Sequence, residues 1–174
     1  MAFGFQPRLL GTLVELRPLR AEDAEELFRV ASDPMIWEQH PARDRYKPEV
    51  FVEFFLGALA SGGALTAIDL VDGKIIGSSR FHGYDAEVSE VEIGWTFLAR
   101  SHWGGRYNGE MKRLMVAHAL NFVHRVVFLI GTGNVRSQRA IERLGGVRAG
   151  TRLDAAGRES YVYEMTSAPG AEAG

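Results

Sequence analysis

Trp103-Gly104-Gly105-Arg106-Tyr107-Asn108-Gly109-Glu110 is a glycine-rich stretch that joins a predicted strand to a predicted helix. Before it, residues 91–97 alternate apolar and polar side chains, the period of a half-buried strand. After it, apolar side chains recur at helical spacing, at Met111, Leu114, Met115, Phe122 and Val126. Such a loop exposes backbone N–H groups at the positive end of a helix dipole, so it predicts a phosphate-binding site.

The loop differs from the two best-known phosphate motifs. It is neither G-x-x-x-x-G-K-[ST], the loop of many nucleotidases, nor G-x-G-x-x-G, the loop of dinucleotide folds. Glycine-rich connections also join strands to helices where no ligand binds. The loop alone therefore leaves an ordinary connection open as an alternative.

The segment that follows the predicted helix narrows the choice. Residues 125–130 form a continuous apolar run after Arg125, which is typical of a buried strand. Residues 134–145 then predict a short amphipathic helix, with Asn134 as its N-cap, Ser137 in its first turn and Gly145 at its end.

This order of elements resembles the GNAT superfamily of acyl-CoA N-acetyltransferases. The resemblance rests on a W-G-x-G-type loop ending in Glu110, and on N-x-x-S-x-x-x-x-E-x-x-G from Asn134. Residues 16–19 (Leu-Arg-Pro-Leu) and 92–95 (Glu-Ile-Gly-Trp) also match the RimJ/RimL-like branch, which contains ribosomal-protein N-acetyltransferases. It covers most of residues 10–165 and implies acetyl-CoA as co-substrate, with no metal. It also implies an α+β fold whose twisted, mostly antiparallel central sheet is splayed between two parallel strands.

The sequence departs from the family pattern in places. Arg106 stands where the usual loop has glycine, and Asn108 where it has glycine or alanine. Arg106 would put a charge on a phosphate that glycine cannot supply. The segment 150–163 is shorter than the branch's usual terminal hairpin, and the sequence lacks the expected terminal Glu-Trp helix. These departures leave open a non-catalytic acyl-CoA-binding or sensor domain of the same fold.

The rest of the sequence predicts a single domain over residues 1–166. A strand is expected at 13–17, a helix at 21–32, and a second helix from Pro48 to Gly62. Two strands, 65–70 and 75–81, flank an Asp-Gly turn typical of a hairpin. Residues 167–174 are expected to form a flexible tail.

Composition excludes several classes of function. The net charge of −2 gives no electrostatic case for nucleic acid or an anionic membrane as partner. The absence of cysteine excludes disulfides, thiolate metal sites and a cysteine nucleophile. Residues 1–7 lack a signal-peptide pattern and no stretch approaches the ~18 apolar residues of a membrane span, so we expect a cytoplasmic protein. A homodimer stays open.

The resemblance places the pantetheine arm of the cofactor between the strand ending at Phe97-Leu98 and the strand 126–130. The acceptor amine then approaches from the opposite side. The expected cofactor-binding residues are Phe97, Leu98, Trp103, Gly104, Gly105, Arg106, Tyr107, Asn108, Gly109, Asn134 and Ser137.

Glu92 is the candidate general base, because acetyl transfer needs a neutral amine. Strand alternation predicts that Glu92 shares the polar face with Gly94 and Thr96, opposite Trp95 and Phe97. The demand on a base depends on the acceptor: deprotonation at pH 7 costs about 1 kcal/mol for an α-amine and roughly 4.6 kcal/mol for a lysine.

Each catalytic candidate has a structural alternative. Glu92 could be a solvated strand carboxylate like its neighbour Glu90. Ser137 matches the family serine whose hydroxyl lies near the sulfur of the cofactor, but a first-turn serine can also cap a backbone group. The tyrosine that some members use as an acid would fall at Ile141, so that route is missing.

The acceptor side is expected to include Trp37, Glu38, His40 and Arg80. Their alternative is a solvated surface, and the five histidines show no metal-binding spacing. A protein N-terminus, an amino acid, a polyamine and an antibiotic amine all stay open as acceptors. A different interpretation, an unrelated α/β nucleotide-binding module, would require free nucleotides to bind in preference to CoA.

Overall fold

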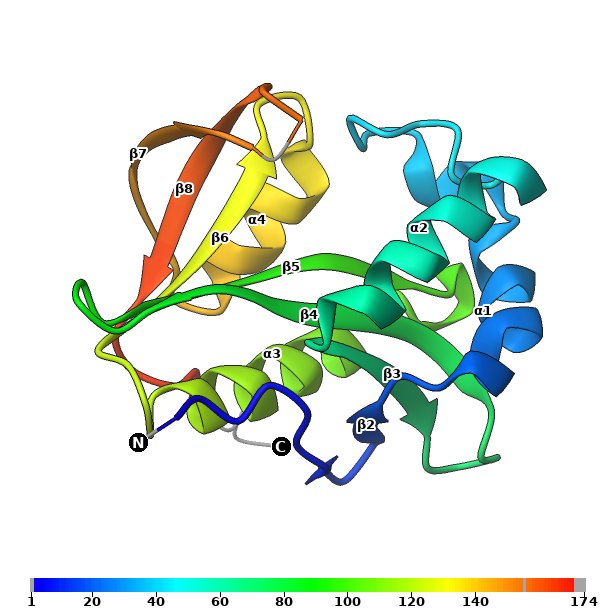
Figure 1. Ribbon diagram of the computed structural model, residues 1–174, viewed down its shortest axis with the longest axis horizontal. Helices are drawn as coiled ribbons and strands as arrows, with labels where there is room; N and C mark the ends of the chain where they lie inside the picture. The colour runs from blue at the N-terminus through cyan, green and yellow to red at the C-terminus, as the bar shows by residue number, and fades with distance from the viewer. Residues whose placement is uncertain (1, 155, 171–174) are drawn as a thin grey trace.

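Eight strands form one sheet, in the order β1-β2-β3-β4-β5-β6-β8-β7, in the computed structural model, which describes residues 2–154 and 156–170 (Figure 1). The strands are β1 Leu9–Leu10, β2 Val14–Pro18, β3 Ala64–Asp69, β4 Ile75–Asp85, β5 Glu90–Leu98, β6 Arg125–Gly131, β7 Val147–Leu153 and β8 Glu159–Met165. Neighbouring strands are antiparallel except β5 and β6, which run parallel. The predicted fold class is confirmed.

Four α-helices and three short 3₁₀ helices connect the strands of the described chain. They are η1 Ala21–Asp23, α1 Ala24–Ala31, η2 Pro34–Trp37, α2 Pro48–Ser61, η3 Arg100–His102, α3 Arg106–Ala119 and α4 Val135–Arg143. Proline at the first position and left-handed Gly62 (φ +67°) set the two ends of α2, as its sequence predicts. The tail predicted for 167–174 falls partly on residues 171–174, which lie outside the described residues.

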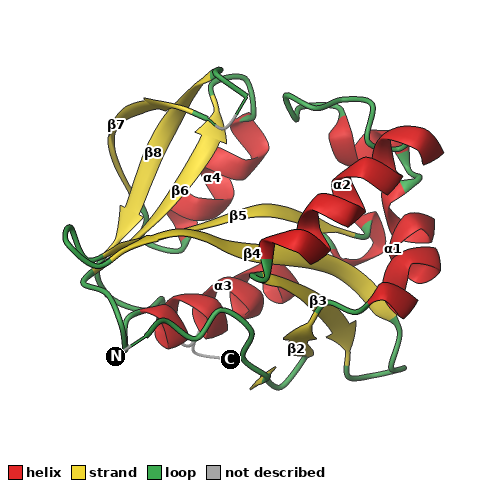
Figure 2. Cartoon of the chain, in the orientation of Figure 1, coloured by secondary structure: helices red, strands yellow, loops and turns green. Residues whose placement is uncertain are grey.

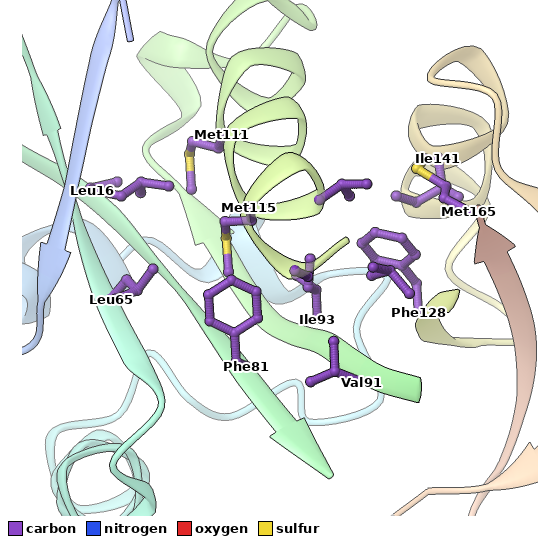
Figure 3. Close-up of a cluster of buried hydrophobic side chains, with 14 of the residues drawn as sticks. Leu16, Leu65, Phe81, Val91, Ile93, Met111, Met115, Phe128, Ile141 and Met165 are labelled. Atoms are coloured by element: carbon purple, nitrogen blue, oxygen red, sulfur yellow. The ribbon is translucent and has the colours of Figure 1, made fainter. Parts of the chain in front are cut away.

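The two faces of the sheet carry separate apolar cores. On one face, α1, α2 and η2 bury a cluster that includes Leu27, Trp37, Phe51 and Phe97. The larger cluster lies on the other face, and Figure 3 shows the helix residues Met111 and Met115 projecting toward the strands. Other members of the larger cluster are Leu16, Leu65, Phe81, Val91, Ile93, Phe128, Ile141 and Met165.

The sheet splits along the seam between β5 and β6. These strands pair only at Glu90–Arg125, Val91–Val126 and Glu92–Val127. Beyond the seam β5 continues along β4, whereas β6 continues along β8, and Figure 2 shows β6 and β8 turning away from β5. The predicted splay is therefore confirmed.

A bulge in β5 changes which side chains share a face. Ser78 pairs with Phe97 and Arg80 with Gly94, so two residues of β5, Trp95 and Thr96, oppose a single residue of β4. Trp95 has φ +52°, a left-handed conformation that is uncommon for a side chain of this size. The extra residue reverses the alternation beyond it.

The predicted faces of this strand are therefore wrong past Gly94. Thr96 hydrogen-bonds to groups on the α3 side, and Phe97 packs in the α1/α2 core, where alternation had put each on the opposite face. Trp95 belongs to neither core cluster; its ring packs edge-on against His82. Among the described residues no helix is long and apolar enough to cross a membrane.

Candidate active site

A cavity of about 770 Å³ lies where β5 and β6 diverge. Its wall includes residues 92–98 of β5, residues 128–131 of β6, and side chains from the N-terminal parts of α3 and α4. Beyond the seam, no backbone pairing between β5 and β6 is present in the described chain. Backbone amides on these edges can therefore bond an extended ligand that enters the gap.

One end of the cavity is the N-terminus of α3. Gly105 is the N-cap of this helix and makes no side-chain capping bond, so the first N–H groups of α3 are offered to the cavity side. Gly104 and Gly105 have φ +112° and +104°. A β-carbon on either would meet nothing within 4 Å, so backbone conformation rather than crowding favours glycine here. The arrangement suits an anion.

The helix begins inside the loop, at Arg106, which decides which loop residues face the cavity. Asn108, Gly109 and Lys112 line it, at the spacing of one helical face. Arg106 is exposed and Tyr107 donates a hydrogen bond to Asp69 Oδ1 (3.1 Å). Every residue predicted to bind the cofactor lines the cavity except Arg106 and Tyr107, because the helical turn directs these two elsewhere.

The N-terminus of α4 forms the wall opposite. Asn134 is buried, and its Oδ1 accepts a hydrogen bond from the Ser137 N–H (3.3 Å), which confirms the predicted N-cap. The Ser137 hydroxyl makes none of the hydrogen bonds found among the described residues, and Ser137 lines the cavity. The hydroxyl is thus available to a ligand and is not used as a backbone cap.

Arg136 ties α4 to the chain across the cavity. Its guanidinium lies 4.0 Å from the ring centre of Trp103, and its Nη2 donates to the Ile36 carbonyl (3.0 Å). The indole Nε1 of Trp103 donates in turn to the Leu98 carbonyl (2.9 Å). This chain of contacts joins η2, the end of β5 and α4 on one side of the cavity.

Glu92 is the cavity carboxylate. Burial raises its pKa to about 7, against a smaller opposing effect of Arg152. Its side chain forms none of the hydrogen bonds or ion pairs found within the described chain. An unpaired carboxylate that titrates near neutral pH can accept a proton from a bound amine.

Glu90 corrects the expectation of a solvated strand carboxylate. It is buried and forms ion pairs of 2.6 Å with both Arg125 and Arg152. Hydrogen bonding from Arg152 and the charges of both arginines hold the pKa of Glu90 below its ordinary value. Two carboxylates separated by one residue thus have opposite environments: Glu90 is paired and ionised, and Glu92 is not.

Lys112 is a cavity residue that the sequence did not single out. It is 5% exposed, its Nζ donates to Thr96 Oγ1, and Thr96 shares a second hydrogen bond of 2.8 Å with the Ser79 hydroxyl. Burial lowers the pKa of Lys112 to about 7. The available signal was its position three and four residues after Gly109 and Asn108, on the loop-proximal face of α3.

The acceptor-side predictions divide. Among the described residues the wall includes Trp37 and His40 but neither Glu38, which is exposed, nor Arg80, which is buried behind it. The Nδ1 atom of His40 accepts a hydrogen bond from the Ala42 N–H (2.9 Å), so the neutral ring carries its proton on Nε2. Burial, with nearby arginines, lowers the pKa of His40 to about 3, which makes it a neutral donor and a poor base.

Metal chemistry has no visible basis in this part of the chain. No group of three or more His, Cys, Asp or Glu side chains that could hold a metal ion occurs within residues 2–154 and 156–170. The chemistry that the cavity residues offer is hydrogen bonding, charge and proton transfer.

Known structures share this architecture. An acetyltransferase of T. thermophilus superimposes with a TM-score of 0.74 at 27% identity, over 95% of this chain and 92% of that one. A GCN5-related N-acetyltransferase from Brucella melitensis gives 0.78 at 20% identity (92% and 79%). Mycobacterium smegmatis RimJ, in complex with CoA-disulfide, gives 0.65 at 20% identity (92% and 85%). The last two likenesses show a common fold.

Sequence comparison gives the family directly. No curated protein matches the chain significantly. The family described as "Acetyltransferase (GNAT) domain" matches residues 14–147, which include β2, the splayed seam, the glycine loop and α4. The chain therefore belongs to the GNAT acetyltransferase family.

Proposed function

We propose that this protein is an N-acetyltransferase that moves an acetyl group from acetyl-CoA directly to a primary amine while both are bound. One observation carries the proposal: a single cavity is lined at once by the backbone anion site at Gly104 and Gly105 and by the unpaired carboxylate of Glu92. Phosphate recognition and proton acceptance are thus available along one ligand path.

The residues present fit acetyl-CoA, which supplies an activated acetyl thioester. The uncapped N-terminus of α3, with Asn108 and Gly109 beside it, would hold the pyrophosphate. Arg139 and Arg143 of α4 also line the cavity and can add charge toward a phosphate. The free backbone edges of β5 and β6 would pair with the amides of the arm.

Glu92 would accept the proton of the acceptor amine. With a pKa of about 7, its carboxyl is roughly half ionised at neutral pH, close to the value at which a general base works best. An α-amine with pKa near 8 requires little further help, whereas a lysine side chain requires roughly 3 kcal/mol more. This difference favours protein N-termini and other α-amines as acceptors, which also agrees with the RimJ-like sequence pattern.

Ser137 would assist the other end of the reaction. Its hydroxyl has no partner within the described chain and faces the cavity from the first turn of α4. A hydroxyl so placed can donate a hydrogen bond to the departing sulfur. Glu92 and Ser137 then serve proton transfer on the amine and on the thiol respectively.

The test is release of free thiol from acetyl-CoA in the presence of an amine panel of peptide N-termini, amino acids, polyamines and aminoglycosides. We expect amine-dependent release that falls at least tenfold in Glu92→Gln, with CoA affinity measured by calorimetry unchanged. CoA binding without release with any amine would support a sensor domain. Preference for free nucleotides over CoA would contradict the cofactor assignment.

A further inference from the structure

Arg80 is a buried charge without a partner. It is 8% exposed, and its Nε is the one buried side-chain nitrogen or oxygen in the described residues that has no hydrogen-bond partner. Its guanidinium packs 4.5 Å from the ring centre of Trp95, whose ring lines the cavity. An ionised side chain left unpaired in the interior is costly, so its retention calls for an explanation.

A second guanidinium lies beside it. Arg45 lines the cavity, and its Cζ lies 4.4 Å from the ring centre of Phe54, the same ring that Arg80 approaches at 5.8 Å. Arg45 also lies 5.5 Å from the Trp37 ring centre. Burial, and then the charges of Arg80 and Arg158, lower the pKa of Arg45 to about 10. Two like charges thus share an aromatic setting.

Other buried or half-buried arginines of this chain do have carboxylate partners. Arg17 forms a two-pronged pair with Asp23 (2.8 Å for each contact), and Arg152 forms one with Glu90. Neither Arg45 nor Arg80 forms an ion pair or a side-chain hydrogen bond with any of the described residues. The fold therefore pairs its arginines elsewhere and leaves these two unmatched.

The nearby carboxylates do not cancel this charge. Glu92 is the carboxylate whose charge acts on Arg80, but it is only partly ionised at neutral pH. Asp154, on the far wall of the cavity, pairs with Arg158 (3.2 Å). The acceptor side thus keeps an excess of one to two positive charges next to the proposed base, which a ligand carrying one negative charge would balance.

We infer that Arg45 and Arg80 form an anion subsite that selects acceptors carrying a carboxylate close to the reacting amine. This inference rests on the proposed function. Arg45, on the cavity wall, makes the direct contact, and a guanidinium fork suits the two oxygens of a carboxylate. Arg80, behind Trp95, contributes the second charge. The carboxylate belongs either to an acidic side chain next to a peptide N-terminus or to a free amino acid.

The experiment compares matched acceptors that differ only in charge. One pair is a peptide with Asp or Asn at its second position; the other is an amino acid and its amide. For the unmodified protein we expect kcat/KM at least tenfold higher with the charged member of one pair, which also identifies the source of the carboxylate. Arg45→Gln and Arg80→Met should lower kcat/KM for that member by about 10- to 100-fold, mainly through KM, and for its neutral counterpart by less than about threefold. Arg80→Met keeps an apolar side chain against Trp95.

Arg43→Gln is the matched control, because Arg43 belongs to the same loop as Arg45, is exposed and is not part of the cavity wall. Equal losses with charged and neutral acceptors in the Arg45 and Arg80 variants would overturn the inference and indicate an effect through Glu92. A preference for phosphorylated over carboxylated peptides would overturn the choice of ligand.

A binding measurement separates this inference from the proposed function. Succinate, which has no amine, should raise the melting temperature of the CoA complex, and succinamide should not; the rise should vanish in Arg45→Gln. Stabilisation by succinate without turnover of any amine would support the subsite while contradicting the proposed function. Turnover without charge preference or succinate stabilisation would do the reverse.

Discussion

Gly94 leaves the space that the carboxylate of Glu92 occupies. A β-carbon at position 94 would lie 3.1 Å from Oε1 of Glu92, tighter than an ordinary contact. Because only the end of a flexible side chain is in the way, Gly94→Ala should fold normally and displace the carboxylate. We expect kcat to fall about tenfold with CoA affinity retained. Calorimetry and thiol-release kinetics would show this, and unchanged kcat would mean that the observed position of Glu92 is not the working one.

The pH dependence of turnover should report Glu92 itself. Its carboxyl is protonated below a pKa of about 7, so the base is lost as pH falls and kcat/KM should rise with pH through that value. Glu92→Gln should be slower and should lose this acidic limb. A variant that keeps the limb would assign it to another group, with the buried amine of Lys112 as the next candidate.

Gly109 should be important for cofactor binding and not for folding. It lines the cavity in the second turn of α3, and a β-carbon there would lie an ordinary 3.6 Å from Leu144. Gly109→Val should therefore fold and should weaken CoA at least tenfold by crowding the approach to the helix N-terminus. Gly57→Val is the control, since Gly57 is an exposed helical glycine with open space around it. Equal CoA affinity in both variants would remove the phosphate site from this loop.

Lys112 should make stability depend on alkaline pH. Burial lowers its pKa to about 7 in the folded chain from the ordinary 10.5, so between these values the unfolded chain binds more protons. The free energy of unfolding should then rise as pH increases from 7 to 10. Lys112→Met should remove most of this rise and should melt a few degrees higher at pH 7. Lys74→Met, at an exposed turn, is the control, and an unaltered pH slope in Lys112→Met would contradict this account.

Glu110 should matter for stability. Its carboxylate accepts hydrogen bonds from the Thr12 N–H and hydroxyl and from the Leu13 and Val14 N–H groups, at 2.7–2.9 Å. Burial alone would raise its pKa, but these bonds outweigh burial and lower it. The stability they provide is present above the unfolded pKa and is lost as pH falls through the folded one.

Glu110→Gln should cost about 2–3 kcal/mol in urea unfolding at pH 7, because an amide cannot accept all four bonds. The deficit should shrink as the solution is acidified. Glu49→Gln, an exposed residue in the first turn of α2, is the control and should change little. A full-sized loss that persists under acidic conditions would point to packing rather than charge.

The sequence predicted the frame of the site because the relevant signals are local. Glycines at 104 and 105, the apolar run of β6 and the Asn134 cap each act within a few residues, and the structure places all of them around one cavity. The resemblance supplied the splay, which no local pattern shows.

The remaining features depend on contacts between distant segments. Glu90 is buried because Arg125 and Arg152 reach it from other strands. The bulge at Trp95 has no glycine to mark it, so simple alternation gave the wrong face for Phe97. Lys112 and Arg45 are ordinary charged positions in the sequence, and only the tertiary structure buries them.

The three-pair seam between β5 and β6 has a consequence for how a ligand is held. Two ribbons, β1 to β5 and β6-β8-β7, are stitched at one end and open at the other. An extended molecule lying between them would act as the missing strand and would restore continuity across the sheet. Binding would then complete the architecture, and the amides that exchange fastest in the empty protein should be those of the open edges, which such a guest would close.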